Sequence, residues 1–271
     1  MKKLLLALLL LCLASPAHAA ESAFDRVMRT GTLRCGFFAW PPGFEIDPNT
    51  KEVKGTTKEL FEALVKLAGW KPEFVEVQFG SYIMDLNSGR VDAICGDGPW
   101  TISNVRLIDY TTPVAYTPMV VYVRADETRF KKNADLNTDK ASFAGIDSDS
   151  STELAQMRFP KANIHTLINI TDPASMLMEV VDKKSDAAIV DPFTGGKFME
   201  HNPGKLKQLG PPLAVYPLSF SLKRGETLLE QTLSRTTEMA LDIGLADSKL
   251  DMFDPARKTV YSPAKSYEAP K

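Results

Sequence analysis

Four polar residues stand where the sequence favours binding of a charged small molecule. Asp97 and Asp191 each follow a short apolar run, and Ser150 and Ser151 precede a segment with helical periodicity. A carboxylate can hold a cation, whereas the free N–H groups and the dipole of a helix start favour an anion. The alternatives are a turn position for Asp97 and ordinary capping by the serines, which is the commoner role of serine before a helix.

Patterns typical of metal sites and of enzyme nucleophiles are absent from the sequence. Beyond the N-terminal leader, the histidines His165 and His201 are far apart and have no neighbouring cysteine. There is no Gly-x-Ser-x-Gly motif and no phosphate-binding glycine loop. Residues 147–152 begin like a calcium loop, but Thr152 stands where that loop requires glycine. We therefore expect no metal and no cofactor.

An internal repeat indicates how the candidate residues are positioned. Residues 83–97 read IMDLNSGRVDAICGD and residues 177–191 read LMEVVDKKSDAAIVD. Each is a helix end, a polar turn, an aspartate (Asp92 or Asp186), a small apolar strand and a final aspartate. The repeated order predicts two α/β lobes of similar design.

The surrounding pattern alternates strands and helices, which predicts parallel βαβ units. The expected strands are 33–38, 74–77, 91–95 and 141–146, and the expected helices are 60–68 and 152–157. In such sheets ligands bind beyond the carboxyl ends of the strands. Trp40, Asp97, Ser150 and Asp191 all fall there, although Trp40 can equally be a core aromatic.

Two extended crossings, near 119–123 and 215–222, are expected to connect the lobes. They predict a discontinuous first lobe, 20–120 with 216–271, and a second lobe, 121–215. The tail after Phe253 contains three prolines and is expected to be loosely ordered.

The N-terminus predicts export. Lys2 and Lys3 precede an apolar run of ten residues, 4–13, and Ala17-His18-Ala19 fits a cleavage site, so 1–19 is interpreted as a signal peptide. Its removal changes the formal net charge from −2 to −4. A mildly acidic chain without a basic run predicts no nucleic-acid partner. We expect a periplasmic monomer.

Cys35 and Cys95 remain after cleavage. An oxidising compartment allows them to pair. The interpretation favoured by the sequence is two unpaired, small apolar residues buried on strands.

Over 26–253 the chain resembles the periplasmic solute-binding proteins of amino-acid-type ABC transporters, the extracellular solute-binding family 3. The resemblance lies in the segments GTLRCGFFAWPPGFE, GTTKELFEALVKLAGW, FGSYIMDLNSGRVDAICGDGPWTI, IDYTTPVAY and SDAAIVD. It implies a type II periplasmic-binding-protein fold of class α/β, each lobe a mixed, mostly parallel sheet flanked by helices.

The resemblance also implies roles for individual residues. Trp40 and Phe79 would pack on the ligand, Asp191 would pair with its amino group, and Ser150 and Ser151 would receive its carboxylate. The expected ligand-binding residues are Trp40, Phe79, Asp97, Gly98, Thr101, Asn104, Ser150, Ser151 and Asp191.

The sequence departs from the family pattern at positions where the family binds the carboxylate of its ligand. Asn104 stands where the family has a carboxylate-binding Arg, and Arg106 is two residues displaced, so that on a helix it would face elsewhere. Pro99 replaces a Thr. Either other groups replace this Arg, or the ligand is not an ordinary α-amino acid; an aromatic or apolar ligand fits the nearby aromatic residues, and an amine fits Asp191.

The resemblance implies capture of a small amino-acid-like or amine-bearing metabolite by hinge closure, and its delivery to an ABC transporter permease. No catalytic residue is expected. One alternative is a periplasmic lyase resembling cyclohexadienyl dehydratase, with Asp97 as a general acid. Another is a ligand-binding sensor or accessory protein.

Overall fold

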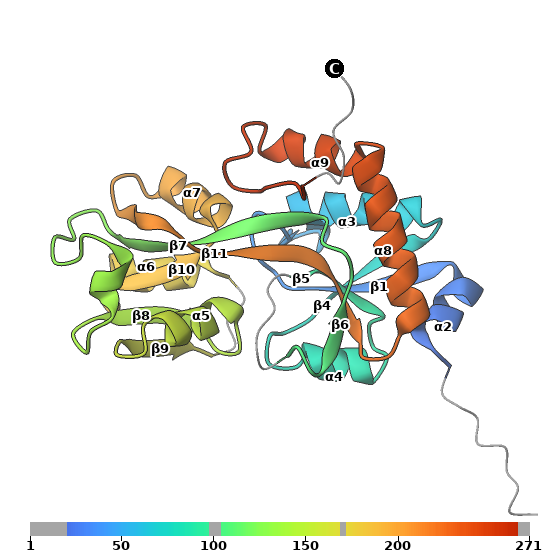
Figure 1. The fold of residues 1–271 in the computed structure, drawn as a ribbon, viewed down its shortest axis with the longest axis horizontal. Coiled ribbons are helices and arrows are strands. Elements are labelled where there is room, and N and C mark those ends of the chain that lie inside the picture. Colours follow the sequence, from blue (N-terminus) through green and yellow to red (C-terminus); the bar gives the residue numbers. More distant parts are fainter. Residues whose placement is uncertain (1–20, 98–103, 169–171, 265–271) are drawn as a thin grey trace, which may run out of the picture.

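The computed structural model describes residues 21–97, 104–168 and 172–264, and places them in two α/β lobes joined by two long strands (Figure 1). The joining strands are β7 (Ala115–Arg124) and β11 (Leu206–Lys223). They run antiparallel to each other and belong to both lobes.

The first lobe is built from both ends of the chain. Its strands are β1 (Thr32–Phe37), β2 (Glu45–Ile46), β3 (Val53–Lys54), β4 (Lys71–Glu76), β5 (Ala93–Asp97) and β6 (Ile108–Tyr110). Its helices are α2 (Ala23–Thr30), α3 (Thr56–Leu67), α4 (Tyr82–Asn87), α8 (Thr227–Asp242) and α9 (Leu245–Phe253). The return of α8 and α9 makes this lobe discontinuous in sequence.

The second lobe is continuous between the two joining strands. Its strands are β8 (Ser142–Ile146), β9 (Asn163–Leu167) and β10 (Ala187–Val190). Its helices are α5 (Ser150–Arg158), α6 (Ala174–Val181), α7 (Pro192–His201) and the short 3-10 helix η1 (Asn133–Leu136).

In the described residues the main sheet has the order β4-β1-β5-β11-β7-β10-β8-β9, and β6 also pairs with β11. Within each lobe the three outer strands are parallel, whereas β7 and β11 pair antiparallel with their neighbours. The pairing of β11 with β7 shifts register between Leu209 and Ala214. Pro211 and Pro212 lie within this interval, and proline has no N–H to donate. The expected α/β fold with mixed sheets is confirmed.

Helix α3 shows why the apolar spacing predicted these elements. Leu60, Phe61, Leu64 and Val65 are all at most 2% exposed, and they form one face of the helix. They pack in the core of the first lobe with residues of β1 and β11. The predicted strands and helices occur within a few residues of their expected bounds.

The internal repeat is visible as matching hydrogen bonds. Asp92 precedes β5, and its Oδ2 accepts from the backbone N–H of Arg34 in β1 at 2.7 Å. Asp186 precedes β10, and its Oδ2 accepts from the backbone N–H of Ser142 in β8 at 3.0 Å. Each aspartate thus joins the start of one strand to its parallel neighbour, at the same place in both lobes.

Cys35 and Cys95 form a disulfide, so the favoured expectation of two unpaired residues is wrong. They lie on the adjacent strands β1 and β5, with their Cα atoms 5.4 Å apart. Both side chains are buried in the first-lobe core. Each residue is a small apolar strand residue, as expected, but the parallel pairing brings the two sulfur atoms together.

The segment 254–264 is not loosely ordered, contrary to expectation. Tyr261 and Tyr116 exchange two backbone hydrogen bonds, of 2.7 and 2.8 Å, so the segment pairs with the start of β7. Asp254 Oδ2 accepts from the N–H groups of Thr259 and Val260 and from the Thr259 hydroxyl. These bonds fold the tail back onto the strand that joins the lobes.

The predicted signal peptide, 1–19, lies outside the described residues, as does the last part of the tail, 265–271. Within the described ranges, no helix combines the length and apolarity needed to cross a membrane.

Candidate functional site

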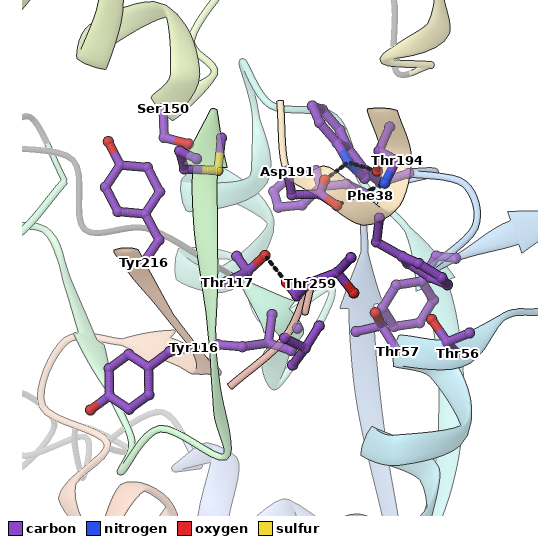
Figure 2. Close-up of a pocket in the computed structure, with 18 of the residues that line it drawn as sticks. Phe38, Thr56, Thr57, Tyr116, Thr117, Ser150, Asp191, Thr194, Tyr216 and Thr259 are labelled. Carbon is purple, nitrogen blue, oxygen red and sulfur yellow. Dashed lines mark hydrogen bonds between the residues drawn. The ribbon is translucent and has the colours of Figure 1, made fainter. Parts of the chain in front are cut away.

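A cavity of about 190 Å³ lies between the lobes, where β7 and β11 pass from one to the other (Figure 2). Residues after β1 and β4 form its first-lobe side, and the starts of α5 and α7 form its second-lobe side. The described residues that line it include Phe38, Trp40, Thr56, Thr57, Phe79, Tyr82, Asn104, Tyr116, Thr117, Met119, Asp149, Ser150, Asp191, Thr194, Tyr216, Asp254, Thr259 and Val260.

Aromatic side chains form the first-lobe wall. The rings of Phe38 and Phe79 are stacked, with centroids 4.2 Å apart. Trp40 meets Phe79 edge-on at 5.8 Å, and Tyr82 meets Phe38 edge-on at 5.3 Å. Trp40 and Phe79 also pack against the apolar core of the second lobe, so this wall spans the gap between the lobes.

Trp40 and Asp191 make a polar contact from one lobe to the other. The indole Nε1 of Trp40 donates to Asp191 Oδ2 at 3.3 Å and to the Thr194 hydroxyl at 3.2 Å. Asp191 is also the N-cap of α7, because its Oδ1 accepts from the N–H of Thr194 at 2.8 Å. The helix start therefore fixes the carboxylate with one oxygen turned toward the indole.

Helix α5 begins at Ser150, and its N-cap is Asp149 rather than a serine. The Asp149 carboxylate accepts from the N–H of Ser151 at 2.8 Å and from the Ser151 hydroxyl. Burial raises the pKa of Asp149, against these hydrogen bonds. Ser150 lines the cavity, whereas Ser151 is 2% exposed, bonds to Asp149 and is not among the lining residues. The structure therefore does not bring Ser151 to the cavity.

Asn104 lines the cavity, and its Nδ2 donates to the Tyr82 hydroxyl at 2.7 Å. Arg106 is exposed and does not line the cavity. The displaced arginine is therefore no substitute for the family's carboxylate-binding Arg.

The structure brings together five of the nine expected residues in one cavity: Trp40, Phe79, Asn104, Ser150 and Asp191. Gly98, Thr101 and the side chain of Asp97 lie outside the described residues. The backbone of Asp97 ends β5 and pairs with Ser219 of β11.

Several lining residues were missed by the sequence analysis. Thr194 was detectable, because Asp191-Pro192 three residues earlier is a strong helix-start pattern. Tyr116 and Tyr216 lie on the joining strands, whose pairing only the fold reveals. Thr259 and Asp254 belong to the tail, whose place against β7 depends on tertiary contacts. In the described part of the chain, no three His, Cys, Asp or Glu residues gather in a possible metal site.

The fold and the cavity define a two-lobed solute-binding protein. The model for bacterial extracellular solute-binding proteins, family 3, matches residues 33–236, and the chain belongs to this family. A probable amino-acid ABC transporter-binding protein of Haemophilus influenzae is 28% identical over 146 residues, which cover 52% of this chain and 56% of that relative. The match thus spans about half the length of that relative.

Solved structures share the fold. An ancestral amino-acid-binding protein, described as a precursor of cyclohexadienyl dehydratase, has a TM-score of 0.75 at 24% identity, covering 86% of this chain and 99% of that one. A mutant of ArgBP from T. maritima has a TM-score of 0.73 at 19% identity, with the same coverage. A histidine kinase sensor domain has a TM-score of 0.71 at 21% identity, covering 86% of this chain and 98% of that one. The two-lobed periplasmic-binding-protein fold is thereby confirmed.

Proposed function

We propose that this protein is a periplasmic solute-binding protein that captures a small amine-bearing or amino-acid-like metabolite and delivers it to an ABC transporter permease. Its lobes are assigned to 20–120 with 216–271 and to 121–215. The observation that carries this proposal is a cavity lined by both lobes and spanned by the hydrogen bond from Trp40 to Asp191. A ligand in such a cavity contacts both lobes at once.

The mechanism follows from that placement. The first lobe contributes an aromatic wall, and the second contributes Asp191 and Ser150. Contacts that exist only when the lobes are together stabilise the closed state, and the ligand shifts the population by the free energy of those contacts. Bending of the two joining strands is sufficient for closure, and no covalent step is required.

The names of related proteins support transport. The curated relative is named a probable amino-acid ABC transporter-binding protein, and one solved relative is named the substrate-binding protein of an amino acid ABC transporter. Another is an ancestral arginine-binding protein bound to arginine. Export by residues 1–19, a monomeric state and the absence of a nucleic-acid partner belong to the same proposal.

Five residues are proposed as ligand contacts from their place in the cavity: Trp40, Phe79, Asn104, Ser150 and Asp191. Asp97 is proposed from its place at a strand end in the sequence pattern, and Gly98 and Thr101 from the family resemblance. Ser151 is proposed only to position Asp149, because its N–H and hydroxyl both bond to that carboxylate.

The test is a thermal-shift screen of the protein lacking 1–19 against amino acids, amines, organic acids and aromatic metabolites. A ligand that binds only the native state at a hundredfold excess over Kd raises the unfolding free energy by about 2.7 kcal/mol. We expect at least one compound to raise the stability of the wild type. The Trp40→Ala variant should lose this shift, whereas the control Met239→Ala, on the exposed face of α8, should keep it. A screen without hits contradicts the proposal, and product formation from prephenate would support the lyase alternative instead.

A further inference from the structure

We propose that the cavity between the lobes selects an organic cation that has no carboxylate group, such as an alkyl amine, a diamine or a guanidinium compound. This inference rests on the proposed function, because it names the class of solute that the same cavity admits. Three features of the lining support it: its acidic residues, the hydrogen bonds that the N–H groups at the start of α5 already make, and the aromatic wall.

The charged residues that line the cavity are all acidic. Asp149, Asp191 and Asp254 line the cavity, and among the described lining residues none is Lys, Arg or His. A carboxylate placed in this cavity would be removed from water without an opposite charge, which is strongly unfavourable.

The helix start that would receive an anion is already occupied by the chain itself. The Asp149 carboxylate accepts from the N–H of Ser151 at 2.8 Å and from the Ser151 hydroxyl. The backbone carbonyl of Asp149 accepts from the N–H groups of Thr152 and Glu153, at 3.2 and 3.3 Å. Three N–H groups of the first turn of α5, those of Ser151, Thr152 and Glu153, are therefore already bonded to Asp149, which leaves little of the ordinary anion site at a helix N-terminus.

The remaining lining fits a cation. Asp191 Oδ2 has the indole of Trp40 as one donor, and a carboxylate oxygen can accept a second hydrogen bond. The stacked pair of Phe38 and Phe79 and the ring of Trp40 present aromatic surface beside it. Aromatic faces attract ammonium and guanidinium groups. The cavity thus offers a cation one carboxylate and several rings.

Matched pairs of ligands test the inference directly. Titration calorimetry with arginine and agmatine, lysine and cadaverine, and phenylalanine and phenethylamine compares each amino acid with the same molecule lacking its carboxylate. We expect at least one amine to bind about tenfold or more tightly than its parent amino acid. In that complex we expect Asp191→Asn to weaken binding about ten- to a hundredfold, the range for one charge-assisted hydrogen bond.

A second variant restores the missing group. Asn104→Arg places a positive charge at the cavity, and we expect it to weaken binding of the amine and strengthen binding of the amino acid. The control is Arg106→Asn, at an exposed position outside the cavity, which we expect to leave both affinities unchanged.

The outcomes separate this inference from the proposed function. If an amino acid binds as tightly as its amine in every pair, the inference is wrong and the solute-binding function stands. If amino acids, amines and the wider metabolite screen all fail to bind, both are wrong. The wild-type comparison alone decides the inference even where a variant does not fold.

Discussion

The indole Nε1 of Trp40 in the first lobe lies 3.3 Å from Asp191 Oδ2 in the second lobe. The same N–H also reaches the hydroxyl of Thr194, at 3.2 Å. The aromatic residue that the family resemblance assigns to packing on the ligand therefore also donates to the carboxylate that the resemblance assigns to the ligand's amino group. The proposed ligand contact and the observed lobe contact thus share one pair of side chains.

Trp40→Phe keeps an aromatic ring and removes this N–H. Because a hydrogen bond to a charged group contributes about 1.5–3 kcal/mol, we expect the ligand-free protein to open and solute affinity to fall about tenfold. Small-angle X-ray scattering would detect a larger radius of gyration, and calorimetry the affinity. Trp70→Phe is the matched control, because Trp70 lies in the first-lobe core away from the cavity. An unchanged radius together with an unchanged affinity would rule out this role for the indole.

Replacing both Cys35 and Cys95 with serine removes the disulfide between β1 and β5. Since it closes a loop with a sequence separation of 60 residues, we expect the free energy of unfolding to fall by about 2–4 kcal/mol. Urea unfolding with and without a reductant measures the effect on the wild-type chain. Equal midpoints in both conditions, together with two titratable thiols in the unreduced protein, would show that the bond does not form.

Asp254→Ala removes the acceptor that folds the tail onto β7. We expect a loss of about 1–3 kcal/mol of stability, because three donors at Thr259 and Val260 lose their partner. Hydrogen exchange should become faster at Val260 and Tyr261. Asp251→Ala serves as the control, since that side chain is 57% exposed and bonds only to Arg257 among the described contacts. Unaltered exchange at Tyr261 in the Asp254 variant would contradict the assignment.

Glu127 should make the stability of the folded chain depend on pH in the acid range. Hydrogen bonds from the Arg129 side chain lower the pKa of Glu127 from 4.5 to about 2, although burial opposes the shift. The unfolded chain therefore binds this proton at a higher pH than the folded chain, and stability falls as the pH drops from about 4.5 toward about 2. We expect the Glu127→Gln variant to be less stable than the wild type at neutral pH. In denaturant titrations its free energy of unfolding should also change less with pH across this window. Asp126→Asn, at a side chain 72% exposed, should retain the wild-type slope.

The sequence predicted those parts of the fold that depend on local pattern. Apolar spacing predicted α3 and the strands β1, β4, β5 and β8, and the repeat around Asp92 and Asp186 predicted two similar lobes. The matching bonds to Arg34 and Ser142 explain why an aspartate stands at both positions. A carboxylate at the start of one strand satisfies a backbone N–H of its parallel neighbour.

The candidate site was predictable only in part. Trp40, Ser150 and Asp191 lie at strand and helix ends, where topology directs side chains to one edge, whereas Phe79 and Asn104 were predicted from the family resemblance. The role of Asp149 was not predictable, because aspartate and serine both cap helices and only the built helix shows which one does. The prediction of a loosely ordered tail was wrong. Prolines indicate irregular backbone, but tertiary hydrogen bonds such as those of Asp254 can still hold such backbone in one conformation.

The pairing of Tyr261 with Tyr116 has a practical consequence for anyone who handles this protein. Tyr261 lies ten residues before the last residue, Lys271, and its partner strand β7 is shared by both lobes. Tyr261 itself therefore lies against a strand that both lobes share. A small environment-sensitive fluorophore attached at position 261, which is exposed, would report each closure as a change in emission, so the chain offers an attachment point for an optical solute sensor.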